Sequence, residues 1–181
     1  TDKEGVVGHK TTQAFGILNE LLVSVSDLKV IYVVRDPRDV VVSSARKWPH
    51  EGRGRIKWVA ESWKNGLIEA LKLKDKFEGR VYLLRFEDLV LQTEEEIDHL
   101  SKFLETPVSM PDELIEYGSL WKNNSSFAET SDLLNVKAVG RWKRRRPWLG
   151  QRVEKECADI MRRVGYEVPV RVPLKTHIRC G

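Results

Sequence analysis

The pattern of apolar and polar positions predicts short strands alternating with longer helices. Val30 to Val34 form an unbroken β-branched and aromatic run, which is typical of a parallel strand covered on both faces. Val6 to Thr11 is a shorter strand candidate, and Arg80 to Leu89 begins with a third. The order of strand, helix, strand, helix, helix, strand and further helices predicts an α/β fold, with a parallel sheet flanked by helices and joined by right-handed crossovers.

Apolar residues recur at helical spacing between and after these strands. A first helix is expected over Ala14 to Val25, with its inner side formed by Phe15, Leu18, Leu21 and Leu22. A tryptophan-rich helix follows, and its spacing favours core packing over a stacking platform for Trp58, Val59, Trp63, Leu67, Ala70 and Leu71. Thr93 with Glu96 predicts a capping box for a helix carrying Ile97, Leu100, Phe103 and Leu104.

The last predicted helix runs from about Gln151 to Val164 and stops at Gly165. One face of it carries Val153, Cys157, Ile160, Met161 and Val164. Two other segments have no clear periodicity. Gly52 to Arg55 is expected to be a basic, glycine-broken loop, and Gly118 to Pro147 a long functional loop.

Composition is ordinary for a single globular domain. The 181 residues are 41% hydrophobic and 32% charged, with a net charge of +4. No apolar stretch approaches the roughly 20 residues that cross a bilayer, and the first ten residues lack a signal-peptide pattern. We therefore expect one domain over residues 1–181, without an internal repeat or linker.

Candidate chemistry gathers where the strand Val30 to Val34 ends. Arg35 follows the strand, and Asp36 with Pro37 predicts an immediate helix start. Ser43 lies two helical turns beyond the cap, so its hydroxyl can converge with Arg35 on one anion. Ligands bind at such strand ends, and arginine offers forked donors to phosphate. In the alternative, Arg35 pairs with Asp36 or Asp39, and Ser43 faces solvent.

These residues resemble a known donor-binding segment. The strand, Arg35-Asp36-Pro37-Arg38 and then Ser43 resemble the 3′-phosphate-binding segment of the sulfotransferase superfamily. Members use 3′-phosphoadenosine 5′-phosphosulfate (PAPS) as the sulfuryl donor, so the resemblance implies that Arg35 and Ser43 bind its 3′-phosphate. Arg80 to Leu89 is similar to the family's strand and aromatic-Glu-Asp-Leu turn, with Phe86 where tyrosine is usual.

The C-terminal region resembles that of Golgi carbohydrate sulfotransferases. The similarity lies in Val139 to Lys143, followed by Cys157, Met161, Gly165 and Tyr166. Where cytosolic relatives have an Arg-Lys-Gly triplet, this chain has Asn135-Val136-Lys137. Trp142 is expected either beside the nucleotide or in the core. The resemblance covers roughly residues 6–166, leaves 167–181 as a tail, and implies a carbohydrate acceptor and no metal.

The family resemblance also implies a P-loop-NTPase-like sulfotransferase fold that is incomplete here. The glycine- and serine-rich loop for the 5′-phosphosulfate is expected before Thr1. We therefore expect a fragment that is inactive alone, with any membrane anchor upstream. The expected compartment is the Golgi lumen, as a type II membrane protein, with the cytoplasm as the alternative.

Lys10 is the leading catalytic candidate. It ends the first strand candidate and resembles the family's strand-end lysine near the transferred sulfonate, although a solvated edge lysine has the same pattern. Cytosolic members carry a histidine two positions later, where this chain has Thr12. The base is left open between His9 and an upstream residue. Lys175-Thr176-His177 lies in the tail, out of order, and is interpreted as coincidence.

The basic run Arg141 to Arg146 suggests an anionic partner. We expect Arg144, Arg145 and Arg146 to face a glycan or glycosaminoglycan acceptor, or a phosphate, from a loop, because Pro147 interrupts any continuous helix. Three alternatives remain: a heparin- or nucleic-acid-binding module without enzymatic activity, a cytosolic-type small-molecule sulfotransferase, and a solvated basic loop. No recognition helix is evident, so nucleic acid is not the expected partner.

Two cysteines bear on the compartment. Cys157 lies on the apolar face of the last helix, and Cys180 follows a proline-containing tail that can fold back. In an oxidising lumen a bridge between them would staple the tail to the domain. The alternative is a buried thiol at Cys157 and an unrelated thiol at Cys180.

Overall fold

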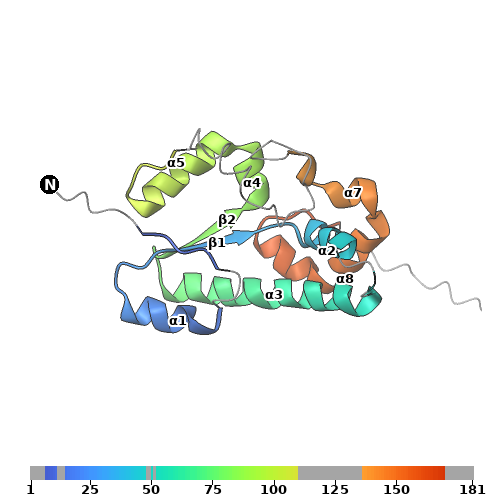
Figure 1. Cartoon of the computed structure of the whole chain (residues 1–181), viewed down its shortest axis with the longest axis horizontal. Helices are drawn as coiled ribbons and strands as arrows, with labels where there is room; N and C mark the ends of the chain where they lie inside the picture. Colours follow the sequence, from blue (N-terminus) through green and yellow to red (C-terminus); the bar gives the residue numbers. More distant parts are fainter. Residues whose placement is uncertain (1–6, 12–14, 48–49, 51, 110–135, 170–181) are drawn as a thin grey trace, which may run out of the picture. The chain divides into compact units, whose positions relative to one another are not determined.

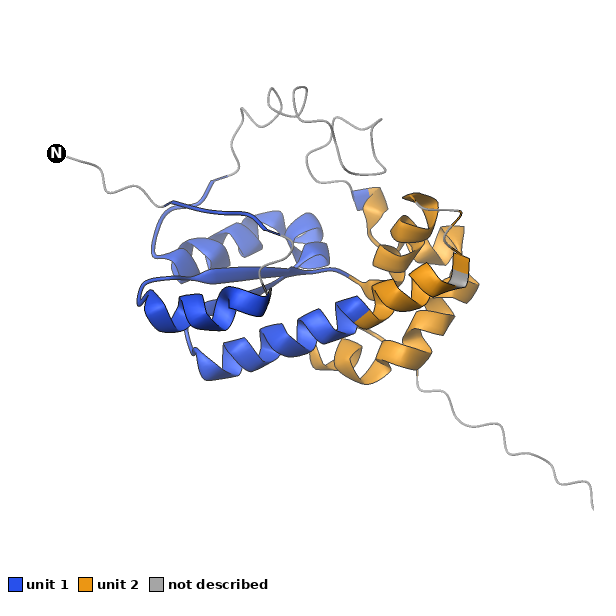
Figure 2. Cartoon of the chain, turned by 60° about the horizontal axis from the view of Figure 1, so that its bottom comes forward, with its two compact units in different colours: residues 1–35, 62–136 blue, residues 36–61, 137–181 orange. Residues whose placement is uncertain are grey.

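The computed structural model describes residues 7–11, 15–47, 50, 52–109 and 136–169. The chain divides into two compact units, each built from two separate segments (Figure 2). Unit 1 comprises Thr1–Arg35 and Ser62–Val136, and unit 2 comprises Asp36–Glu61 and Lys137–Gly181. Whether they function as the single predicted domain stays a prediction, and each unit is described by itself.

Unit 1 contains a parallel pair of strands. β1 (Val30–Val34) pairs with β2 (Val81–Arg85) in the register Val30↔Val81 to Val34↔Arg85. The helical elements of this unit are α1 (Phe15–Ser24), the part of α3 (Gly52–Lys76) from Ser62 onward, α4 (Phe86–Leu91) and α5 (Thr93–Leu104). The parallel pairing agrees with the predicted α/β class.

Helices lie on both sides of the strand pair in unit 1 (Figure 1), although β1 stays partly exposed. On one face, α1 and α3 pack against the sheet through buried Leu22, Leu73 and Val81. On the other face lies α5, where the ring centroids of Tyr82 and Phe103 are 5.3 Å apart and the Tyr82 hydroxyl donates to Glu96 at 3.1 Å. Since Val81 and Tyr82 are consecutive strand residues, strand alternation sends them to opposite layers.

Unit 2 is helical in its described residues. It contains α2 (Pro37–Lys47), the first residues of α3, the 3₁₀ turn η2 (Val136–Ala138, whose first residue is assigned to unit 1), α7 (Arg141–Arg145) and α8 (Pro147–Arg163). α2 packs against α7 and α8. The buried face of α8 confirms the predicted stripe through Val153, Cys157, Ile160 and Met161, whereas Val164 is half-buried.

The end of α8 confirms the predicted stop at Gly165. Gly165 has φ 79°, its N–H donates to Arg162 O at 3.1 Å, and the Tyr166 N–H donates to Met161 O at 3.0 Å. These two hydrogen bonds form a Schellman motif. The motif holds Gly165 in the left-handed backbone region, which glycine adopts without steric cost.

Two expectations about strands are wrong. Residues 7–11 are not a strand, so the candidate Val6 to Thr11 fails over its described part. β1 was predicted to be covered on both faces, yet Ile31 and Val33 are 37% and 56% exposed. An apolar run identifies a strand by its β-branched content, but the run cannot report which neighbouring elements cover it.

Several helical details also differ from the sequence predictions. The expected loop Gly52 to Arg55 is the start of α3, and the expected core residues Leu21 and Trp58 are 38% and 57% exposed. Leu22 in α1 and Val59, Leu67 and Ala70 in α3 are buried as predicted.

The predicted capping box is wrong, although its helix is correct. The N-cap of α5 is Gln92, without a side-chain cap hydrogen bond. The Thr93 hydroxyl donates back to Leu89 O at 2.8 Å, while Glu96 accepts from Tyr82. The Thr93 and Glu96 side chains therefore form hydrogen bonds with Leu89 and Tyr82 in place of the reciprocal bonds of a capping box.

The predicted long loop, Gly118 to Pro147, is replaced by helical elements from Val136 onward. Its residues 118–135 lie outside the described part of the chain. Among the described helices, none is both long enough and apolar enough to cross a membrane.

Candidate functional site

Arg35 lies at the carboxyl end of β1 and stacks on an aromatic ring. Its guanidinium carbon is 4.8 Å from the centroid of the Phe86 ring. Phe86 begins α4 directly after β2, and the register pairs Val34 with Arg85. Because the strands are parallel, the residue following each strand emerges at the same sheet edge. Arg35 and Phe86, which come from two segments that resemble sulfotransferases, therefore meet in unit 1.

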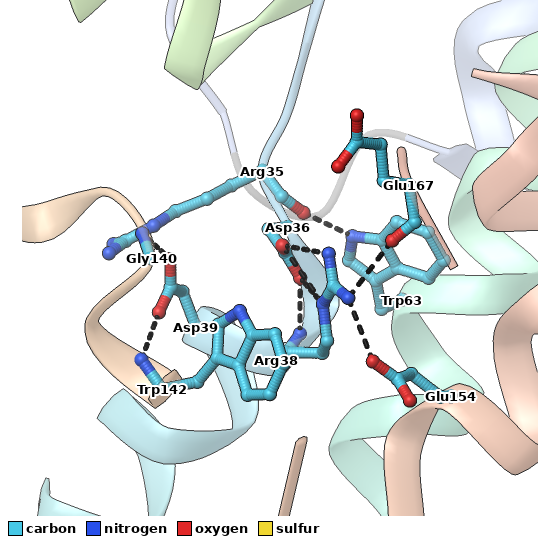
Figure 3. A network of polar contacts seen from close by, with 9 residues as sticks. All are labelled: Arg35, Asp36, Arg38, Asp39, Trp63, Gly140, Trp142, Glu154 and Glu167. Atoms are coloured by element: carbon cyan, nitrogen blue, oxygen red, sulfur yellow. Dashed lines mark hydrogen bonds and ion pairs between the residues drawn. The ribbon is translucent and has the colours of Figure 1, made fainter. Parts of the chain in front are cut away.

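Trp63 fixes the backbone at this position. Its indole N–H donates to Arg35 O at 2.8 Å (Figure 3). Sequence analysis assigned Trp63 to the core, and it is half-buried. A buried tryptophan N–H usually has a hydrogen-bond acceptor, so the residue type indicated a polar contact. The sequence could not identify which group accepts.

The helix after Arg35 starts as predicted. Pro37 is the first residue of α2, and the Asp36 carboxylate accepts the Arg38 backbone N–H at 2.8 Å. The Asp36 carbonyl accepts the N–H groups of Asp39 and Val40, each at 3.0 Å. Asp36 thereby satisfies amide groups at the helix start that have no partner within the helix.

Arg38 forms the buried ionic centre of unit 2 (Figure 3). Only 6% exposed, it pairs with Asp36 at 2.7 Å and Glu154 at 2.8 Å, and donates to Glu167 O at 3.1 Å. Burial alone lowers the pKa of Arg38, but the hydrogen bonds and charges of Asp36 and Glu154 outweigh it and raise the pKa above the ordinary value. This arginine is a structural ion-pair partner.

Asp39 ties α2 to the start of α7 and the residue before it. The fully buried carboxylate accepts the backbone N–H of Gly140 at 2.8 Å and of Trp142 at 2.7 Å. Gly140 has φ 62°, a conformation that glycine adopts easily. These contacts pair Asp36 with Arg38 and direct Asp39 to backbone N–H groups of unit 2, and the alternative that either acid also pairs with Arg35 stays a prediction.

Trp142 is packed within this part of unit 2. It is 9% exposed, and the Arg38 guanidinium carbon lies 4.5 Å from its ring centroid. A Cβ at Gly150 would collide with the Trp142 ring, so the small residue admits the tryptophan. The core alternative for Trp142 fits these contacts, while its packing beside a nucleotide stays a prediction.

Ser43 and Lys10 keep their proposed roles only as predictions. Ser43 is half-buried on α2 in unit 2, whereas Arg35 belongs to unit 1, so their convergence on one anion stays a prediction. Lys10 is exposed. The strand end that motivated its choice is absent, because residues 7–11 are not a strand.

The basic run forms part of a pocket. α7 ends at Arg145, Arg146 has φ −152°, and Pro147 begins α8, so the predicted break is confirmed although the run is a short helix instead of a loop. A pocket of about 390 Å³ is lined by Val42, Arg46, Arg141, Arg145 and Arg146.

The pocket changes the expected set of arginines. Arg144 is not among its lining residues and instead donates to Lys137 O at 2.8 Å. Arg46 was missed from the sequence. Its only signal was the four-residue spacing from Val42, which places both on one face of a helix without showing what that face meets.

Cysteine and metal chemistry add little to the site. Cys157 is buried, with its Sγ 3.8 Å from Ala60 O, and Cys180 lies outside the described residues, so their bridge stays a prediction. Within the described residues, no group of three or more histidine, cysteine or acidic side chains could hold a metal ion.

Comparison with known proteins gives one family. The model of the sulfotransferase domain family matches residues 16–145, a span that includes Arg35, Ser43, Phe86 and α7. No curated protein and no solved structure matches the chain.

Proposed function

Because this chain belongs to the sulfotransferase domain family, we propose that it moves a sulfuryl group from PAPS to a hydroxyl of a carbohydrate acceptor. Family membership makes the chain a sulfotransferase, and the donor and the acceptor class are the proposal. The observation that carries the donor assignment is the stacking of Arg35 on Phe86 at the carboxyl edge of the β1–β2 pair.

The Arg35–Phe86 geometry suits a phosphate. A guanidinium stacks through its flat face and binds oxyanions through the N–H groups around its edge. A ring against the face therefore orients Arg35 through the part of the guanidinium that does not bind oxyanions. Phe86 supplies that ring even though it lacks the hydroxyl of the family's usual tyrosine, so the substitution is compatible with donor binding.

Sulfuryl transfer requires positioning and cationic stabilisation. The acceptor hydroxyl oxygen forms a bond to sulfur, the bond from sulfur to the donor's bridging phosphate oxygen breaks, and the hydroxyl proton passes to a base. Charge spreads over the moving group, so nearby cations lower the barrier. We assign Arg35 and Ser43 to the donor's 3′-phosphate and Lys10 to the transferred group.

The carbohydrate branch is favoured by the C-terminal residues. Cys157, Met161 and Tyr166, which carry that resemblance, are all at most 5% exposed, so they shape the core around α8. This branch places the protein in the Golgi lumen. Non-reducing peptide mapping tests that placement: a Cys157–Cys180 bridge supports it, and recovery of both thiols in alkylatable form counts against it.

The donor assignment is tested by replacing Arg35. Arg35→Ala should weaken binding of the product nucleotide, 3′-phosphoadenosine 5′-phosphate (PAP), by roughly 1.5–3 kcal/mol, because it removes a charge-assisted contact. That corresponds to about 10- to 150-fold in Kd by calorimetry. Arg35→Lys should weaken PAP binding less than Arg35→Ala, because lysine keeps the charge but lacks the forked N–H donors of arginine. Ser43→Ala should also cost less PAP-binding free energy than Arg35→Ala.

Lys64→Ala is the matched control, because Lys64 is an exposed cation on the unit 1 part of α3. Its PAP affinity should equal that of the unaltered protein. Unchanged PAP affinity in Arg35→Ala would contradict the assignment of Arg35 to the donor. For the acceptor, a chain that also carries the expected donor loop should pass labelled sulfate from PAPS to glycans in preference to small phenols and steroids. The reverse preference would support the cytosolic-type alternative.

A further inference from the structure

The pocket in unit 2 concentrates positive charge in a small concave space. Four of its five lining residues are arginines, and the fifth is the apolar Val42. None of the described residues lining this pocket carries a carboxylate. Guanidinium groups gathered in this way repel one another and raise the positive potential within the pocket. An oxyanion placed among them would relieve that repulsion.

The pocket is formed by two helices of unit 2 and the residue that joins the second of them to α8. Val42 and Arg46 come from one face of α2, Arg141 and Arg145 come from α7, and Arg146 joins α7 to α8. Arg141 lies between Gly140 and Trp142, whose backbone N–H groups are both held by Asp39. The arginine backbone is therefore anchored before any ligand arrives, which lowers the ordering cost of binding.

We propose that this pocket binds an oxyanion already present on the acceptor, a sulfate ester or a uronate carboxylate, so that the preferred acceptor is an anionic glycan. The inference rests on the proposed carbohydrate acceptor and narrows it. Arg46, Arg141, Arg145 and Arg146 are the binding residues, and Asp39 is a positioning residue.

Charge and size favour an acceptor anion over the donor. The donor's 3′-phosphate is already assigned to Arg35 and Ser43, and a single phosphate does not require four further cations. A volume of about 390 Å³ is in the range of small-molecule sites and accommodates a sugar with its charged substituents.

A nucleic acid is disfavoured by the lining residues. Single-stranded binding sites combine cations with aromatic platforms for the bases, and no aromatic residue lines the described pocket. The nearby ring of Trp142 is buried rather than presented to a ligand. Arginines gathered around one pocket suit discrete sulfate or carboxylate groups, which they bind through paired N–H donors.

The test compares two double variants with equal loss of charge. Arg46→Gln/Arg145→Gln removes two cations from the pocket, whereas Arg152→Gln/Arg163→Gln removes two exposed cations of α8 outside its lining. Binding of a sulfated heparin tetrasaccharide and of its desulfated, N-acetylated counterpart is measured by calorimetry without PAP, at 50 and 300 mM NaCl. Thermal unfolding of each variant verifies that it is folded.

The pocket variant should bind the sulfated tetrasaccharide at least tenfold more weakly, with a smaller salt dependence, while the α8 variant stays within about twofold. The desulfated sugar, which keeps its uronate carboxylates, separates the two ligands: weak binding to every protein identifies a sulfate ester, and binding that only the pocket variant loses identifies a uronate. PAP affinity should be unchanged in the pocket variant. Because the glycan measurement omits PAP, failure of the donor assignment at Arg35 would leave this result intact.

Three outcomes would overturn the inference. Equal losses in the two double variants would indicate nonspecific attraction to a basic surface. Loss of PAP binding with intact glycan binding would make the pocket a donor phosphate site. Tighter binding of a DNA tetranucleotide than of the sulfated tetrasaccharide, lost only in the pocket variant, would identify a nucleic-acid site.

Discussion

Two groups of arginine in unit 2 have opposite surroundings. Arg38 is buried between Asp36 and Glu154, while Arg46, Arg141, Arg145 and Arg146 line a pocket without a carboxylate among its described lining residues. Arg38 is held by both side-chain ion pairs and the Glu167 backbone oxygen. The comparison shows that two neighbouring acids hold Arg38 within the fold, whereas the ligand-binding role of the pocket arginines is our proposal.

Replacing an arginine should change the free energy of unfolding in different directions in the two groups. A buried ion pair balances desolvation against attraction, so removing one partner leaves the other charge buried without compensation. In the pocket, four arginines share a small space, so removing an exposed one such as Arg46 should relieve part of their mutual repulsion. The same substitution of arginine should therefore destabilise one group and leave the other unchanged or slightly more stable.

The largest effect should come from Arg38. Arg38→Met should lower the free energy of unfolding by about 3–5 kcal/mol, because Glu154 is only 4% exposed and would lose its cation. Urea denaturation measures the change. Arg162→Met is the control, since Arg162 is an exposed cation paired with Asp159 at 3.2 Å, and it should cost less than about 1 kcal/mol. Equal losses would remove the distinction between buried and exposed pairs.

Asp39 should give an intermediate effect. Asp39→Asn turns an amide NH₂ toward one of two backbone N–H donors, which should cost about 1–3 kcal/mol of unfolding free energy. It should also weaken binding of the sulfated tetrasaccharide, because the backbone beside Arg141 loses an anchor. Asp159→Asn, at a fully exposed carboxylate, should change neither the free energy of unfolding nor the affinity for the tetrasaccharide. Intact glycan affinity in Asp39→Asn would show that the anchor does not position Arg141.

The smallest effect should come from the pocket itself. Arg46→Gln should change the free energy of unfolding by no more than about 0.5 kcal/mol, in the stabilising direction, because it relieves repulsion at an exposed site. Raising the NaCl concentration should reduce the difference in unfolding free energy between Arg46→Gln and the unaltered protein, because salt screens the repulsion. A loss above about 1 kcal/mol would mean that Arg46 acts as a structural cation, like Arg38.

Local signals in the sequence predicted the elements that depend on nearby residues. Asp36 with Pro37 determined where α2 begins, and Gly165 determined where α8 ends, because caps and left-handed turns involve residues a few positions apart. The parallel strand pair also followed from local patterns. Arg35 was identified correctly as the residue after β1, whereas its role in binding stays a prediction.

Contacts between distant residues were not predictable in the same way. Arg38 and Glu154 are 116 positions apart, and neither carries a local mark of burial. Arg46 became a candidate only when α2 was seen to share a pocket with α7. Lys10 was chosen for a strand end that residues 7–11 do not form, because a short apolar stretch alone cannot establish a sheet partner.

The contacts of Asp39 with Gly140 and Trp142 also bear on the order of folding. They span 101 and 103 positions, and the whole second segment of unit 1, Ser62–Val136, is synthesised between them. β1 and β2 can pair once Arg85 has left the ribosome, whereas α2 must wait for a partner made much later. Closing so long a loop carries an entropic cost that slows long-range contacts. We therefore expect unit 1 to acquire structure first, with α2 completing its packing only after α8 is synthesised.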